Sequence, residues 1–299
     1  MVFTICPPDK KIPGFGIFLS GGLCFWWRFF VSDTAIGVVG AGGRMGRMLV
    51  QAITQTEGAR LVAASERPGS DLLGLDAGGL AGVGSLGIML TDAAHATFSP
   101  DRVVIDFTAP AATLTHIQWA VEKSCPMVIG TTGLDAKGVE ALEKAAQSIP
   151  IVFAPNYSVG VNLMFKIAAE VAKVLDGSAD FEVIEAHHRH KVDAPSGTAL
   201  GLGQAIAAAV GRNLNEVGVF SREGFTGERE AKSIGFATIR GGDIVGDHTA
   251  LFAGESERLE ITHRAGSRMI FANGAVRAAL WVVDQKPGLY NMGDILGFT

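Results

Sequence analysis

Most of the residues that could carry acid–base and anion-binding chemistry fall within one stretch, EAHHRHKVDAPSGT, from Glu185 to Thr198. It contains three of the 7 histidines, and positions 187–191 are consecutive residues able to carry positive charge. The whole chain has a formal net charge of −5, so this stretch is a local exception. A short basic cluster in an acidic protein favours a small polyanion over nucleic acid as the ligand. We therefore expect a substrate that bears carboxylates.

A helix start follows the basic residues directly. Pro195 and Ser196 signal the beginning of a helix that we expect to extend to Ala209. The unpaired N–H groups and the positive dipole end of such a helix attract an anion, and Gly197 would allow a close approach. Ser196, Gly197 and Thr198 are therefore candidate substrate-binding residues. A plain helix cap is the alternative, but it leaves the neighbouring basic residues unexplained.

Two other interpretations of the basic stretch are weaker. His187, His188 and His190 could ligate a metal, but consecutive positions on a strand point to opposite faces. The chain also has neither of the helical spacings H-x-x-x-H and H-E-x-x-H, so we expect no metal site there. A solvated charged turn would not account for the adjoining Pro-Ser-Gly-Thr. Arg240 and His248 lie in glycine-rich turns, where they could contact the substrate or lie at the edge of the domain, and we expect them at the edge.

A second motif, GAGGRMG at residues 40–46, follows a short apolar segment that is typical of a buried strand. Apolar residues then recur at helical spacing, so the glycines occupy a strand-to-helix turn. Gly40 permits the tight turn, Gly42 lets the backbone approach a pyrophosphate, and Gly46 allows the helix to pack closely on the strand. The turn predicts a dinucleotide site formed by Gly40, Gly42, Gly43, Arg44, Met45 and Gly46.

The next strand, expected over residues 60–64, leads to two residues that bear on the choice of nucleotide. Glu66 has the spacing and charge of the residue that binds the adenosine ribose hydroxyls, which favours NADH. Arg67 could pair with a 2′-phosphate or stack on adenine, which favours NADPH. The sequence therefore permits either nucleotide, NADH or NADPH.

Strands and helices continue to alternate as far as about residue 158. This order predicts a parallel sheet with helices on both faces, in which ligands bind beyond the carboxyl ends of the strands. Three segments fall at such ends, and together they could hold the nicotinamide. The candidate cofactor-binding residues in them are Phe107 and Thr108, then Gly130, Thr131 and Thr132, then Ala154, Asn156 and Tyr157.

The pattern changes after about residue 159. A helix is followed by strands expected from residue 181 and over 233–239, 247–252 and 258–263, with neighbours joined by short turns expected to be antiparallel. A closing helix, expected over 268–283, could pack back on the first part. The predicted fold class is α/β: a Rossmann-like parallel-sheet dinucleotide domain at 35–158 and 268–299, plus an α+β substrate and oligomerisation domain at 159–267.

Composition fits a soluble enzyme, with 48% hydrophobic and 18% charged residues in 299. Cys6, Cys24 and Cys125 form no C-x-x-C pair, which favours a reducing compartment such as the cytoplasm. Residues 1–34 combine two lysines with an apolar run, but Arg28 interrupts that run, and prolines and glycines weaken it as a helix. We interpret these residues as a dispensable extension rather than a membrane-associating segment.

Taken together, the motifs resemble those of the dihydrodipicolinate reductase family. The resemblance covers the chain from about residue 35 onward, and the HHRHKxDAPSGT block is its most specific part. Tyr157 stands where many members carry Phe, which should matter little for an aromatic packing role. The other motifs that carry the resemblance are GAGGRMG at 40–46, IDFT at 105–108, GTTG at 130–133, NYSVG at 156–160, SREG at 221–224, GFATIRGGD at 235–243 and FANGA at 271–275.

The resemblance implies NAD(P)H-dependent reduction of a cyclic dicarboxylate to tetrahydrodipicolinate, on the route to diaminopimelate and lysine, by a homotetramer joined through its substrate-domain sheets. Imidazole titrates near neutral pH, so we expect His187 to be the general acid. Lys191 would hold a carboxylate and stabilise charge on the ring nitrogen, and His188 would be a further substrate contact. Two alternatives stay open: another imine- or carbonyl-reducing dehydrogenase, and a non-catalytic nucleotide sensor.

Overall fold

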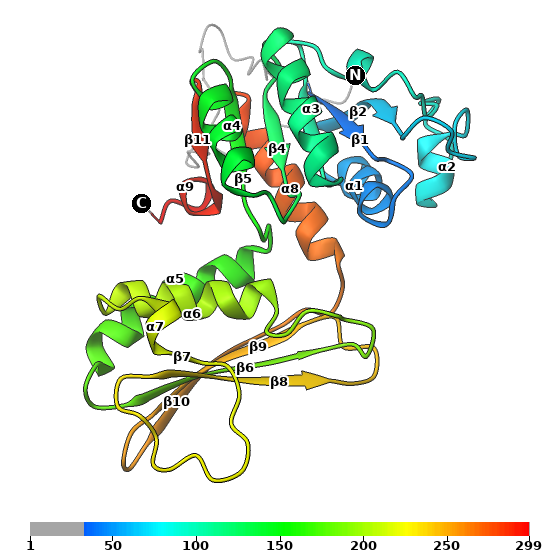
Figure 1. Ribbon diagram of the computed structural model, residues 1–299. Helices are drawn as coiled ribbons and strands as arrows, with labels where there is room; N and C mark the ends of the chain where they lie inside the picture. The colour runs from blue at the N-terminus through cyan, green and yellow to red at the C-terminus, as the bar shows by residue number, and fades with distance from the viewer. Residues whose placement is uncertain (1–32, 299) are drawn as a thin grey trace, which may run out of the picture. The chain divides into compact units, whose positions relative to one another are not determined.

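The computed structural model describes residues 33–298, and the predicted N-terminal extension lies almost wholly outside this range. The first of two sheets has six strands, all parallel, in the order β11-β5-β4-β3-β1-β2 (Figure 1). Its central strands are short apolar runs buried on both faces, as expected where helices cover both sides. The strands are β1 (Thr34–Val39), β2 (Ala59–Ser65), β3 (Val103–Asp106), β4 (Met127–Ile129), β5 (Pro150–Phe153) and β11 (Gly288–Tyr290).

Helices cover both faces of this sheet. On one face, α1 (Arg44–Gln55) and α8 (Met269–Val282) enclose a core with the inward side chains of β1 and β3. On the other face, α3 (Pro110–Glu122) and α4 (Ala136–Ala146) enclose a second core. The two cores sandwich the sheet and fix the direction in which all its strand ends point. Shorter elements complete this part: α2 (Ala77–Ala81), η1 (Ala94–Thr97) and α9 (Met292–Leu296).

The second sheet is mixed, in the order β10-β9-β6-β8-β7. Two helices, α5 (Val159–Leu175) and α6 (Gly197–Ala209), lie along one of its faces, as Figure 1 shows. Its inward residues and these helices form a separate core that includes Phe181, Val183 and Phe252. The strands are β6 (Asp180–His187), β7 (Gly218–Val219), β8 (Ile234–Arg240), β9 (Asp247–Ala253) and β10 (Arg258–Arg264), and α7 (Leu214–Val217) precedes β7.

The predicted fold class, α/β with a Rossmann-like sheet and a second mixed domain, is confirmed. The strand neighbours expected to be antiparallel are so for β9 and β10, but β8 and β9 do not pair. Instead β6 lies between them, antiparallel to β9 and parallel to β8. The segment from β6 to β8 contains α6 and is long enough to cross over and return in parallel. The sequence patterns also missed β11, which is only three residues long.

Within residues 33–298, no helix has the length and apolarity needed to cross a membrane.

Helix α8 packs tightly against the loop that follows β5, and Gly274 is the residue of the helix that makes this close contact possible. A Cβ added at Gly274 would lie 1.8 Å from the Tyr157 carbonyl oxygen, a backbone atom that cannot move aside cheaply. We expect Gly274→Ala to lower the free energy of unfolding by about 3 kcal/mol or more, at the upper end for overpacking. Denaturant unfolding would measure it.

Gly79→Ala is the matched control, because it also lies in a helix but its added Cβ would have no neighbour closer than 3.8 Å. There we expect equal or slightly greater stability, since Ala is the better helix former. Equal losses in the two variants would show that the contact with Tyr157 is not the cause.

Candidate active site

The loop after β1 takes the conformation that its glycines predicted. Gly40 has a φ of 68°, in the left-handed region, and the Gly43 N–H donates to the Gly40 carbonyl at 3.1 Å to close the turn. A Cβ on Gly46 would lie 2.2 Å from that same carbonyl oxygen, so α1 could not begin so close to the strand with any other residue. The turn therefore delivers the first turn of α1 to the carboxyl edge of the sheet.

The N-terminus of α1 has no side-chain cap, a property that it shares with α3, whose first residue is Pro110, and with α8. Gly43 occupies its cap position and supplies no side-chain acceptor, so the first N–H groups of α1 stay available. By contrast, the first turns of α4, α5 and α6 each donate to a capping side chain, from Asp135, Ser158 and Ser196. An open helix start behind a glycine turn fits a pyrophosphate, and this observation supports a dinucleotide at the site.

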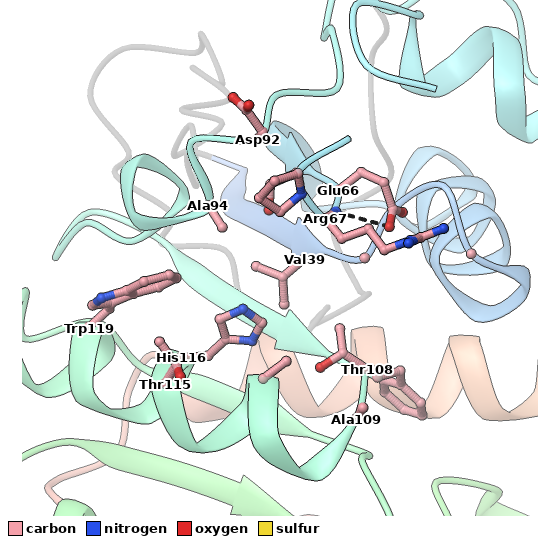
Figure 2. A pocket seen from close by; sticks show the side chains of 16 residues that line it. Val39, Glu66, Arg67, Asp92, Ala94, Thr108, Ala109, Thr115, His116 and Trp119 are labelled. Carbon is pink, nitrogen blue, oxygen red and sulfur yellow. Dashed lines mark hydrogen bonds between the residues drawn. The ribbon is translucent and has the colours of Figure 1, made fainter. Parts of the chain in front are cut away.

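A cavity of about 480 Å³ adjoins this loop (Figure 2). Gly40 and Gly43 border it, Glu66 and Arg67 line one side, and His116 and Trp119 of α3 line the other. Glu66 already accepts hydrogen bonds from two backbone N–H groups, of Gly42 at 2.9 Å and Arg67 at 3.0 Å. It therefore holds the glycine loop as well as bordering the space expected for the nucleotide.

A buried carboxylate that the sequence analysis did not single out organises the far side of this cavity. Asp106, at the end of β3, is fully buried. Its Oδ1 accepts from the Thr108 hydroxyl at 2.6 Å and the Thr108 N–H at 3.0 Å, and its Oδ2 lies 2.8 Å from His116 Nδ1. The Thr131 hydroxyl lies 3.0 Å from the Thr108 nitrogen. The network fixes the predicted residues Thr108 and Thr131, and Thr131 itself is buried.

A second cavity, of about 500 Å³, brings the two predicted groups of residues together. Arg44, Met45 and Phe107 border it from the glycine-loop side, and Phe107 also lines the first cavity. The substrate-side residues that border it are His187, His188, His190, Lys191 and Thr198, together with Arg268, which the sequence analysis did not name.

Several predicted residues border neither cavity. Ala154 is buried, and Gly130 packs so closely on Phe107 that an added Cβ would lie 2.2 Å from its ring. Thr132 and Gly197 are exposed outside both cavities. Ser196 is buried, and its hydroxyl accepts from the Ala199 N–H and lies 3.0 Å from His248 Nε2.

Tyr157 and Asn156 connect the loop after β5 to its surroundings. The Tyr157 hydroxyl lies 2.9 Å from the Ile129 carbonyl oxygen and 3.1 Å from that of Val152, so the phenol adds polar contacts that a Phe would lack. The expectation of a packing role alone was therefore incomplete. Asn156 donates to the Thr198 hydroxyl at 3.0 Å, which ties this loop to the start of α6.

His187 ends β6 on the strand's buried face, where Glu185 also lies because residues two apart share a face. His187 Nδ1 is 2.6 Å from Glu185 Oε2, and a carboxylate can only accept, so Nδ1 carries the proton. Burial lowers the pKa of His187, and Lys191 and Arg240 add to this effect, although Glu185 partly opposes it. The net shift is downward, so the imidazole is mainly neutral at neutral pH in the free protein.

Arg240 and His248 were expected at the domain edge, and that expectation was wrong. Arg240 donates to both oxygens of Glu185, each at 2.8 Å, and His248 is a buried residue of β9 with its ring 5.1 Å from that of His187. Pairing of β6 with β8 and β9 brings these distant residues beside His187. Burial lowers the pKa of His248 to about 4, so this ring is neutral.

Glu185, His187 and His248 approach closely enough to raise the question of a metal ion. The carboxylate, however, already accepts from a guanidinium, from the imidazole and from the Ser196 N–H at 3.1 Å. A neighbouring guanidinium also repels a second cation. The donor arrangement is that of a hydrogen-bond network.

Lys191 and His188 face the second cavity with partners of their own. Lys191 Nζ donates to Asp193 Oδ1 at 2.8 Å, and His188 Nε2 lies 3.4 Å from Arg268 Nη2. His188 Nδ1 is buried and has no hydrogen-bond partner within residues 33–298. The cavity thus presents a lysine, two arginines and imidazoles, which suits an anion with more than one carboxylate.

Comparisons with known proteins identify the family of this chain. Residues 34–157 match the family described as "Dihydrodipicolinate reductase, N-terminus", and residues 160–296 match "Dihydrodipicolinate reductase, C-terminus". A 4-hydroxy-tetrahydrodipicolinate reductase of Magnetococcus marinus is 63% identical over 263 residues, which is 88% of this chain and 98% of the relative. One of Alkalilimnicola ehrlichii is 57% identical over 264 residues, covering 88% and 99%.

Solved structures support the fold. A dipicolinate-bound dihydrodipicolinate reductase from Paenisporosarcina sp. TG-14 superposes with a TM-score of 0.68 at 24% identity, covering 87% of this chain and 97% of that one. An amine dehydrogenase from Mycobacterium smegmatis gives 0.56 at 14% identity, covering 86% and 94%. Similarity at this level of identity supports the fold alone. The two family matches, by contrast, span nearly all of residues 33–298. The chain therefore belongs to the dihydrodipicolinate reductase family.

Proposed function

We propose that this protein reduces 4-hydroxy-tetrahydrodipicolinate to tetrahydrodipicolinate with NAD(P)H, a step in diaminopimelate and lysine biosynthesis. The observation that carries the proposal is the second cavity, where Arg44 and Met45 of the glycine loop and His187 and Lys191 border one space. A reductase of a dicarboxylate needs a nucleotide site and a cationic substrate site that meet in this way. The curated relatives carry the name of this reaction.

The nucleotide, when bound, supplies the hydride. The open start of α1 would bind its pyrophosphate, and Glu66 and Arg67 would contact its adenosine. Phe107, Thr108 and Asn156 would border its nicotinamide end, with Gly130, Thr131, Thr132, Ala154 and Tyr157 supporting them. Because Glu66 suits a ribose hydroxyl and Arg67 suits a phosphate, we propose that the enzyme accepts both NADH and NADPH.

The substrate carboxylates would lie against Lys191, His188 and the start of α6. The Ser196 hydroxyl caps the helix by accepting from the Ala199 N–H, so contact with an anion at this helix would come from Thr198 and the backbone of Gly197. Lys191 would also stabilise negative charge that develops on the ring nitrogen. Arrival of a dianion favours the protonated form of a nearby imidazole, so we propose that His187 takes up a proton in the complex and donates it to the reduced ring.

The remaining assignments concern organisation. We propose that residues 35–158 and 268–299 form the dinucleotide-binding domain and residues 159–267 the substrate and oligomerisation domain. The face of the second sheet opposite α5 and α6 carries the exposed side chain of Ile239 of β8, which supports assembly into a tetramer through this sheet. We further propose that the enzyme acts in the cytoplasm.

His187→Ala should lower kcat by about a hundredfold or more, the usual loss on removal of a general acid, while nucleotide affinity changes little. Nucleotide oxidation followed optically, with substrate generated freshly by the upstream synthase from pyruvate and aspartate semialdehyde, measures the first quantity, and nucleotide titration the second. His95→Ala is the control, because His95 is 43% exposed and borders neither cavity. Turnover equal to that of the wild type would remove His187 from this role.

Lys191→Ala should raise KM for the dicarboxylate and lower kcat, because one cation both holds a carboxylate and stabilises charge in the transition state. Lys173→Ala removes an exposed lysine of α5 and should leave both constants unchanged. A wild-type KM in the Lys191 variant would show that this side chain does not hold the substrate.

Arg67→Ala should raise KM for NADPH by about tenfold or more and leave KM for NADH nearly unchanged, since only NADPH carries the 2′-phosphate that the guanidinium would bind. Arg60→Ala on β2 is a control for the general loss of positive charge. Equal effects on both nucleotides would instead indicate that Arg67 stacks on the adenine.

A further inference from the structure

Arg240 occupies a position that the sequence pattern of the active site did not suggest. In the parallel register of β6 and β8, Arg240 pairs with His187, which places its guanidinium beside the strand end that carries the imidazole. The guanidinium donates to both carboxylate oxygens of Glu185, at 2.8 Å each, and also to the Asp193 carbonyl at 2.6 Å. Its side chain is only 20% exposed. Such a bidentate, largely buried pair has one well-defined geometry.

Glu185 has little freedom left to move. Besides the guanidinium, its Oε1 accepts from the Ser196 N–H at 3.1 Å, and its Oε2 receives the proton of His187 Nδ1 at 2.6 Å. The imidazole is therefore held through one nitrogen by a fixed acceptor. Its other nitrogen, Nε2, has no hydrogen-bond partner among the described residues. Gly246 adjoins that nitrogen, and a Cβ there would lie 3.0 Å from it, so a glycine keeps this side open.

We propose that Arg240 is a positioning residue of the reaction: by binding both oxygens of Glu185, it orients His187 and sets how readily the free nitrogen of His187 accepts a proton. The proposal rests on the proposed function in one respect only, that the proton on His187 is then donated to the reduced ring of the substrate. Glu185 alone would hold a positive charge on His187, as a lone buried carboxylate does with a neighbouring imidazole. Arg240 neutralises that carboxylate, so the imidazole can remain neutral until an anionic substrate arrives.

The other charged and titratable groups around His187 do not replace Arg240 in this role. On β9, His248 is neutral. In the loop after β6, Lys191 is paired with Asp193. Arg44, Arg268, His188 and His190 border the cavity itself, where they can respond to a bound anion. Burial by itself would raise the pKa of Glu185. Hydrogen bonds from Arg240, His187 and Ser196 outweigh this effect and keep the pKa of Glu185 below its ordinary value.

The test measures the pKa of His187 in the free enzyme by NMR of histidine labelled with ¹³C in the ring, with the signal assigned by its loss in His187→Gln. Arg240→Met should raise this pKa by about one unit or more, because the full charge of Glu185 then acts on the imidazole. Glu185→Gln should lower it. Arg240→Lys keeps the positive charge and should leave the pKa close to that of the wild type. Arg240→Gln, which also removes the charge, replaces the Met variant if that variant does not fold.

Arg222→Met is the matched control, since Arg222 makes a similar bidentate pair, at 2.8 and 2.9 Å, with Glu182 on the same strand. It should leave the pKa of His187 unchanged. The proposal is overturned if the variant that removes the charge of Arg240 leaves this pKa unchanged, or if it moves the pKa in the same direction as Glu185→Gln.

The pH dependence of kcat/KM separates this proposal from the proposed function. If His187 supplies the proton, the alkaline limb of the profile should move to higher pH in Arg240→Met, by the same amount as the pKa measured by NMR. An NMR shift without a matching kinetic shift would uphold the positioning role of Arg240 and show that another group protonates the substrate.

Discussion

Two buried carboxylates, one at the end of β3 and one two residues before the end of β6, impose the constraint on which the rest of the site depends. Asp106 and Glu185 are at most 1% exposed, and a charge removed from water in this way must be surrounded by donors. Asp106 gathers a hydroxyl, a backbone N–H and an imidazole, whereas Glu185 gathers an imidazole, a guanidinium and the N–H of a helix cap. The donors come from several segments of the chain, so satisfying the charges also fixes the loops around both cavities.

Local sequence predicted the parts of the site that adjacent residues determine. The turn geometry at Gly40 and the helix start at Ser196 follow from side-chain size and capping within a few residues, and the structure has both. The partners of the carboxylates could not be found in this way. Arg240 is 55 residues from Glu185 in sequence, and its place depends on β8 lying in parallel beside β6, which no local pattern specifies. The alternation along β6 did contain one usable signal, because Glu185 and His187 share its buried face.

Side-chain caps distinguish α5 and α6 from α1, whose first N–H groups stay available to a ligand. Ser158 and Ser196 complete α5 and α6 internally, while α1 begins at a glycine that offers no acceptor. A helix start left open costs stability, which other contacts of the fold must offset. A small residue before a helix therefore has one of two effects. A serine caps the helix with its hydroxyl, whereas a glycine leaves the first N–H groups available to a ligand.

The position of the last elements in the first sheet has a consequence for biogenesis. Strand β11 pairs with β5, and α8 covers β3, β4 and β5, yet both are synthesised after the entire second sheet. On the ribosome, β5 therefore emerges with one edge unpaired and one face uncovered, while residues 154–298, more than half of the described residues, have still to follow. Such an exposed edge is a site for aggregation, so the nascent protein should depend on chaperones until its C-terminus is released.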